Sequence, residues 1–146
     1  MRKIIKKIFI VLSVLSLNNA TIYASDSNKW DAVLNAISEI ESKGIPDVVS
    51  KNGKYVGILQ ISTVLVDECN RLVGEKCFTY DHRLDVEKSY EMFFIIQRHY
   101  NKENDIEKAI RLWNGGPKYS IQKTEAYYQK VLKVMRDEQE KENNRS

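Results

Sequence analysis

The chain has 146 residues, with 23 Lys and Arg against 20 Asp and Glu, two His and two Cys. This length suits a single domain with one modest core. Four of the basic side chains fall in the first 24 residues, which hold no acid, so the other 122 residues carry 19 basic and 20 acidic groups. That balance offers no basic surface, and we expect no nucleic-acid partner.

The first 24 residues have the pattern of a secretory signal peptide. Basic residues at positions 2, 3, 6 and 7 lead into an apolar run over residues 8–17, and the segment ends in small and polar residues at Ala24. The alternatives are a membrane anchor or a buried helix, but the run is far shorter than the roughly 20 residues that a membrane span needs. We expect cleavage after Ala24, export to the periplasm or the medium, and no later membrane contact.

Residues 25–135 are predicted to form one mainly α-helical domain. Apolar residues at helical spacing recur in five segments, and no alternating run is long enough to build a sheet. The first predicted helix covers about residues 27–42 and stops near Gly44 and Pro46. Residues 43–56 are predicted to form a loop or a short irregular hairpin.

Three further helices have recognisable ends. The second begins at Ser62 or Thr63 and ends at Gly74, a natural left-handed terminator. Asp85 is the predicted cap of a long third helix, and Asp105 caps a fourth that breaks at residues 115–117.

The fifth predicted helix covers about residues 124–135. The last eleven residues, 136–146, contain no side chain that could anchor them to a core. We expect this charged tail to fray or to be disordered.

Cys69 and Cys77 are the two cysteines of the chain. In an exported protein a disulfide between them is favoured, because the compartment lets disulfides persist. The alternative is two buried thiols, since a sequence does not give the distance between the two α-carbons.

Glu41 occupies a position where packing favours an aliphatic residue. Counting from Trp30, the buried stripe of the first helix falls at residues 33, 34, 37, 40 and 41. Glu39 lies about 200° round the helix and faces solvent. Burial of a carboxyl group raises its pKa toward that of a general acid. The alternative, in which Glu41 caps a helix or pairs with a Lys at the helix end, stays open on periodicity alone.

Four segments in order carry a family resemblance. They are Ile40-Glu41-Ser42, Gly57-Ile58-Leu59-Gln60-Ile61, Leu112-Trp113-Asn114-Gly115-Gly116, and the stretch from Thr124 to Val131. Together they resemble the motifs of lytic transglycosylases and goose-type lysozymes of the lysozyme-like superfamily, over residues 30–135. The resemblance implies a lysozyme-like α-helical domain in which a loop or hairpin forms one side of a cleft.

The resemblance also implies residue roles. Glu41 matches the catalytic acid, Gly57 and Gln60 match the segment that lines the cleft, Asn114 matches the Asn of the next motif, and Tyr127 matches the Tyr that closes the site.

Two positions depart from the family pattern. Trp113 replaces the usual Tyr, and its helical spacing favours a core position over a sugar platform. Tyr55 occupies a position where the family usually has a small residue. Two interpretations stay open: a residue that stacks on sugar in the cleft, or an aromatic residue of the loop with no such role.

The chemistry implied needs only one carboxylate. Asp47, Asp81 and Asp85 are better explained by a loop and by helix caps. The 2-acetamido group of the substrate can then stabilise the anomeric carbon, which is the substrate-assisted exception among glycosidases. Glu41 would cut the bond between N-acetylmuramic acid and N-acetylglucosamine and form a 1,6-anhydro product. A hydrolytic lysozyme and a noncatalytic peptidoglycan-binding or assembly protein are the alternatives.

No metal or cofactor is expected. His82 and His99, the two histidines, have no metal-ligand spacing with each other or with the cysteines, and no phosphate-binding glycine loop occurs. The expected partner is the peptidoglycan glycan strand, and the expected state is a monomer. The sequence leaves open whether the protein acts within or at the end of a strand, and whether it serves wall growth, an envelope-spanning secretion or conjugation apparatus, or attack on rivals.

Overall fold

The computed structural model describes residues 29–145. The chain divides into two compact units, Met1–Ala32 and Val33–Ser146. In the first unit only residues 29–32 are described, and they are helical. The signal peptide expected over residues 1–24 lies outside the described residues. In the second unit residues 33–42 are helical, as predicted.

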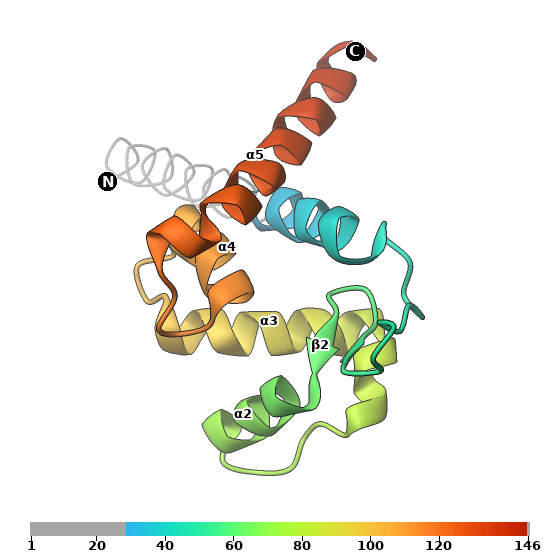
Figure 1. Ribbon diagram of the computed structural model, residues 1–146, viewed down its shortest axis with the longest axis vertical. Coiled ribbons are helices and arrows are strands. Elements are labelled where there is room, and N and C mark those ends of the chain that lie inside the picture. Colours follow the sequence, from blue (N-terminus) through green and yellow to red (C-terminus); the bar gives the residue numbers. More distant parts are fainter. Residues whose placement is uncertain (1–28, 146) are drawn as a thin grey trace, which may run out of the picture. The chain divides into compact units, whose positions relative to one another are not determined.

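Four labelled helices follow in the second unit, which confirms the mainly helical prediction (Figure 1). They are α2 (Thr63–Val73), α3 (Val86–Tyr100), α4 (Ile106–Gly115) and α5 (Ile121–Asn143), with a short 3-10 helix, η1 (Tyr80–Leu84), before α3. In the part of the chain that the structure describes, no helix is both long and apolar enough to span a membrane.

The predicted helix starts are confirmed by their side-chain caps. Ser62 accepts a hydrogen bond from the backbone N–H of Leu65 at 3.3 Å, and Asp85 accepts one from that of Lys88 at 3.0 Å. Each of these bonds satisfies a backbone donor that has no partner within its helix. At the other end of α2, Gly74 adopts the left-handed conformation, with φ 89°, that terminates the helix.

A two-stranded antiparallel hairpin interrupts the helices. Its strands are β1 (Tyr55–Val56) and β2 (Ile61–Ser62), with Tyr55 opposite Ser62. The turn between them is the Gly57–Gln60 segment. Within residues 43–56, where the sequence predicted a loop or a short irregular hairpin, Val49 forms an antiparallel bridge with Val56, so an irregular hairpin is present there and β2 adds a further strand beside it. Strands of two residues are too short to show an alternating pattern.

The third helix holds the core together. It packs against α2, η1 and α4, and α4 in turn packs against α5 (Figure 1). Met92, Phe93 and Ile110 are fully buried between them. Burying each such side chain stabilises the fold by about 1.5–3 kcal/mol.

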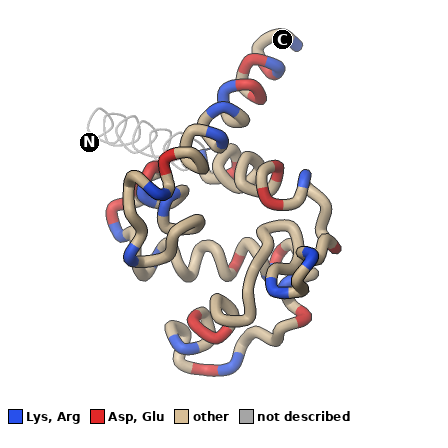
Figure 2. Tube along the Cα trace, viewed as in Figure 1, with Lys and Arg blue, Asp and Glu red and all other residues tan. Residues whose placement is uncertain are grey.

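The last helix is longer than predicted at both ends. Ser120 caps it three residues earlier than expected, and it continues to Asn143 through residues that were expected to fray or be disordered. Basic and acidic residues alternate along its last turns (Figure 2). Lys133 and Asp137 pair there at 3.9 Å, one turn apart. Opposite charges at this spacing support a helix that has little core contact.

The disulfide expected between Cys69 and Cys77 is absent from the structure. Both residues are free thiols. Cys69 is buried on the inner face of α2, where its Sγ donates to the Met92 carbonyl at 3.6 Å. Cys77 is exposed in the loop after α2. Helix geometry directs the first thiol into the core, while the loop leaves the second in solvent.

Candidate active site

A cavity of about 320 Å³ lies where the end of the first helix meets the hairpin, α2 and α4. Its lining residues come from these four elements: Glu41, Tyr55, Leu59, Gln60, Ser62, Leu65, Trp113 and Asn114. Four segments that are far apart in the sequence therefore contribute to one hollow. Three of the predicted catalytic and substrate-binding residues, Glu41, Gln60 and Asn114, line it.

Glu41 is held by a residue from the far end of the chain. The Tyr127 hydroxyl of α5 donates a 2.7 Å hydrogen bond to Glu41 Oε1. Burial raises the pKa of the Glu41 carboxyl above its ordinary value of 4.5, and the Tyr127 bond opposes this rise to a lesser extent. The Lys at the helix end, Lys43, pairs instead with Glu39 at 3.4 Å. Of the two interpretations left open above, the structure thus favours the desolvated carboxyl.

Tyr127 stays a hydrogen-bond donor. Burial and the neighbouring Glu41 carboxylate both raise its pKa well above the ordinary value. The phenol therefore keeps its proton over the whole physiological range. Its position beside Glu41 agrees with the role that the family resemblance implies.

Ser42 ties the helix that carries Glu41 to the hairpin. This side chain is buried, and its hydroxyl donates to the Ile58 carbonyl at 2.8 Å. The bond joins the residue after Glu41 to the turn that carries Gln60. The two sides of the cavity are thus connected directly, which fixes their separation.

Gln60 has a narrower role than its residue type suggests. Its amide nitrogen donates to the Val48 carbonyl at 3.0 Å and to the Gly57 carbonyl at 2.9 Å. Both amide hydrogens are therefore used to hold the loop, and the group that Gln60 can offer to a ligand is its amide oxygen. Its backbone is in the left-handed region, with φ 49°, which is uncommon for a residue with a side chain.

Gly57 supports the site without lining the cavity. A β-carbon there would lie 1.7 Å from the Arg83 carbonyl oxygen, and the backbone φ is 84°. Both features require glycine. This glycine lets the hairpin turn approach the end of η1, and its expected contact with substrate stays a prediction.

Trp113 and Tyr55 are the two departures from the family pattern, and both line the cavity. Trp113 also packs on Phe93, with ring centroids 5.2 Å apart, so it is a core residue and a cavity wall at once. Tyr55 is 46% exposed on β1. An aromatic ring partly open to solvent beside a cavity suits stacking on a ligand.

Leu59, Ser62 and Leu65 line the cavity as well, and the sequence pattern does not single them out. Leu59 and Leu65 read as ordinary core residues, and Ser62 reads as a helix cap. They reach the cavity because the hairpin turn and the first turn of α2 lie against it. That placement is set by tertiary packing and has no local signature.

A second, mainly apolar cavity of about 570 Å³ adjoins the first. The two share Ser62, Leu65 and Trp113, and the second continues between α2, α3 and the segment after α4. Val64 and Pro117 are among the residues that line it. Together the two cavities provide room for a ligand larger than a single sugar.

The thiols are unsuited to nucleophilic chemistry. Burial raises the pKa of Cys69 to about 12, and a hydrogen bond with Glu75 raises that of Cys77. Because the thiolate is the reactive form, neither cysteine is activated. Within residues 29–145, no three or more His, Cys, Asp or Glu side chains gather into a possible metal site.

The raised pKa of Glu41 predicts a pH-dependent effect on stability. Below the unfolded-state pKa both states are protonated. As the pH rises, the unfolded state ionises first, so the free energy of unfolding falls until the folded-state pKa is passed. Glu41→Gln removes this loss while still accepting the Tyr127 bond. Urea unfolding should therefore give the variant a larger advantage at about pH 7 than at about pH 4.

Each pKa unit by which Glu41 differs between the folded and unfolded states changes the free energy of unfolding by about 1.4 kcal/mol. Comparing the two proteins at each pH cancels the titration of the other acidic residues. An equal difference in stability at both pH values would mean that Glu41 is not desolvated in the folded protein.

One of the comparisons with known proteins found a match. The family model of the transglycosylase SLT domain matches residues 18–135. No curated protein and no solved structure matches the chain. The match covers every residue that lines the first cavity, together with Tyr127. The family comprises peptidoglycan glycosidases of the lytic transglycosylase type, which act in the cell envelope. The chain therefore belongs to the transglycosylase SLT domain family of the lysozyme-like superfamily.

Proposed function

We propose that this protein is a lytic transglycosylase that cuts the β-1,4 bond between N-acetylmuramic acid and N-acetylglucosamine, with Glu41 as the general acid and then the base. The observation that carries the proposal is the desolvated Glu41 carboxyl in a cavity that spans four elements of a family domain. Glu41 is the one carboxyl group among the described residues that line this cavity. That lining supports a single-carboxylate mechanism.

In the first step Glu41 gives its proton to the bridging oxygen. The bond from this oxygen to the muramic anomeric carbon breaks, and N-acetylglucosamine leaves as the alcohol. The carbonyl oxygen of the muramic 2-acetamido group bonds to the anomeric carbon and takes up the positive charge. The raised pKa of Glu41 suits this step, because the acid has to be protonated near neutral pH.

In the second step the Glu41 carboxylate takes the proton of the muramic 6-hydroxyl. The hydroxyl oxygen attacks the anomeric carbon and displaces the acetamido oxygen, which gives the 1,6-anhydro ring. Glu41 ends protonated, as it began, and no other reactant is consumed. Tyr127 holds Oε1 throughout, which leaves Oε2 to exchange the proton with the substrate.

The remaining groups position the sugar. The Gln60 amide oxygen can accept from a sugar N–H or hydroxyl, because the Gln60 amide hydrogens are used within the loop. Asn114 adds a second amide to the lining of the cavity, and the Tyr55 ring offers a stacking face. The adjoining apolar cavity extends the binding region, which suits a polymeric glycan over a short oligosaccharide. The proposal includes export by the segment 1–24, so that the enzyme meets its substrate.

Digestion of purified peptidoglycan sacculi tests the proposal. The expected products are mainly 1,6-anhydro muropeptides, identified by mass analysis, because the muramic 6-hydroxyl and not water completes the reaction. Hydrated reducing ends would instead identify a hydrolytic lysozyme. Binding to sacculi without any release of fragments would identify a noncatalytic peptidoglycan-binding protein, and either result would contradict the proposal.

A further inference from the structure

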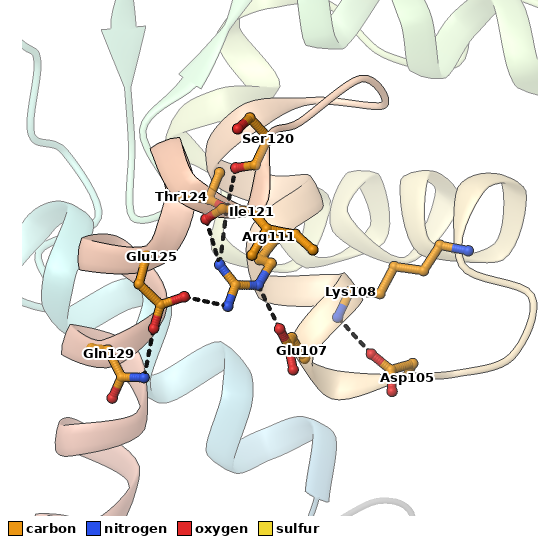
Figure 3. Close-up of polar contacts among 9 residues, drawn as sticks. All are labelled: Asp105, Glu107, Lys108, Arg111, Ser120, Ile121, Thr124, Glu125 and Gln129. Carbon is orange, nitrogen blue, oxygen red and sulfur yellow. Dashed lines mark hydrogen bonds and ion pairs between the residues drawn. The ribbon is translucent and has the colours of Figure 1, made fainter.

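Arg111 is a charged side chain on α4 that is almost fully buried, with 3% of it exposed. Its guanidinium forms ion pairs with two carboxylates, Glu107 at 2.7 Å and Glu125 at 2.6 Å (Figure 3). Glu107 lies one turn earlier on the same helix, whereas Glu125 lies on α5. The two acids are equally accessible, at 48% and 46% exposed. One of the two ion pairs therefore stays within α4, and the other bridges two helices.

The guanidinium makes three more contacts with α5. It donates to the Ile121 carbonyl at 3.0 Å and to the Thr124 hydroxyl at 3.1 Å (Figure 3). It also lies over the Tyr128 ring, 4.3 Å from the ring centroid. A planar guanidinium can make several such directed bonds at once, which a Lys ammonium cannot do in the same geometry. Arg111 thus fixes both the distance between α4 and α5 and the rotation of α5 about its axis.

A steric contact holds the helices at the same point. A β-carbon on Gly115 would lie 2.6 Å from Tyr119 Cβ and 2.8 Å from Thr124 Cγ2. The end of α4 and the first turn of α5 are therefore as close as their backbones allow. Thr124, which accepts from Arg111, is also the residue that Gly115 has to accommodate.

These contacts surround the two helix segments that carry active-site residues. Arg111 lies three residues before Asn114, and its partners on α5 lie on both sides of Tyr127, from residue 121 to residue 128. Tyr127 is in turn bonded to Glu41. A rotation of α5 would move the Tyr127 hydroxyl away from the carboxyl.

We propose that Arg111 is a positioning residue, which acts through its ion pair with Glu125 to set α5 so that Tyr127 reaches Glu41. The inference rests on the proposed function, and it assigns a role in catalysis to a residue outside the cavity. Arg111 acts through Tyr127, and it contacts no substrate.

Two matched variants test this assignment. Glu125→Ala removes the bridging ion pair, and Glu107→Ala removes the ion pair within α4 from the same guanidinium. With soluble, uncrosslinked glycan strands, Glu125→Ala should lower kcat by about 10- to 100-fold with little change in KM, as misplacement by about an ångström does. Glu107→Ala should keep the wild-type kcat. Gln129→Ala serves as a second control, because Glu125 also accepts from Gln129 at 2.8 Å.

A double-mutant cycle with Tyr127→Phe distinguishes an effect on the position of Tyr127 from a general loss of stability. If Arg111 and Glu125 act through the Tyr127 hydroxyl, Glu125→Ala should cost less than about threefold in the Tyr127→Phe background, because the two losses are not additive. Equal losses of kcat in both backgrounds, or equal losses from Glu107→Ala and Glu125→Ala, would overturn the assignment. If Glu125→Ala fails to fold, Glu125→Gln is measured in its place, with a smaller loss of kcat expected.

A spectroscopic readout keeps this test distinct from the proposed function. The ¹³C signal of the Glu41 carboxyl, assigned by its disappearance in Glu41→Gln, should move in Glu125→Ala and not in Glu107→Ala. An inactive wild-type protein with this shift would disprove the function and leave the positioning contact standing. An unmoved signal in Glu125→Ala would disprove the positioning contact, whatever the activity.

Discussion

Replacing Glu41 by Gln is expected to reduce the release of muropeptides from sacculi by at least about 100-fold. The two side chains have nearly the same shape, and Gln can still accept the 2.7 Å hydrogen bond from Tyr127. The fold should therefore persist, as checked by circular dichroism. What is lost is the proton that the bridging oxygen needs and the carboxylate that later removes a proton from the muramic 6-hydroxyl.

Glu39→Gln is the matched control. It changes an acid on the same helix that is 44% exposed and paired with Lys43, outside the cavity. This variant should keep the wild-type rate. A Glu41→Gln protein that retained more than about a tenth of the wild-type rate would show that another group supplies the acid.

The helices could be predicted because their signals are local. Ser62, Asp85 and Asp105 each accept from a backbone N–H in the first turn of the following helix, as their residue types indicated. Gly74 ends α2 in the left-handed conformation. Caps and apolar periodicity need no knowledge of the rest of the chain, so a single sequence is enough to find them.

Part of the site could be predicted by the same reasoning. Glu41 stands on an apolar stripe, which made a desolvated carboxyl one of two interpretations, and the structure favours it because Lys43 pairs with Glu39. The hydrogen bonds of the Gln60 amide within the loop could not be predicted from sequence periodicity. They depend on where the Val48 and Gly57 carbonyls lie in the folded chain. The Arg111 contacts depend in the same way on how α5 packs.

The C-terminal end of α5 differs from the prediction for another reason. Its last buried residue is Val131, so a prediction based on core-forming positions ends the helix soon afterwards. The helix continues to Asn143 because charge spacing, and not burial, supports its last turns. Apolar periodicity alone does not detect this contribution of charged residues.

Trp113→Ala is expected to lower the free energy of unfolding by about 3 kcal/mol, the lower end of the usual cost of truncating a core aromatic. The lower end applies because Trp113 is only partly buried. One face of its ring packs on Phe93, with ring centroids 5.2 Å apart. Removing the ring exposes that contact and opens a void at the end of α4. Urea unfolding followed by circular dichroism measures the loss.

The same substitution should also weaken glycan binding, because Trp113 forms part of the wall of both cavities. We expect a rise in KM of up to about tenfold, because an aromatic contact contributes about 0.5–1.5 kcal/mol and about 1.4 kcal/mol is a factor of ten. Trp113→Phe is the control that separates the two effects. A phenyl ring can still pack on Phe93 and should recover most of the stability, but it covers less of the wall between the cavities and should recover less of the binding. If Trp113→Ala lost stability with an unchanged KM, Trp113 would be a core residue only, and the cavity wall at this position would have no part in holding the glycan.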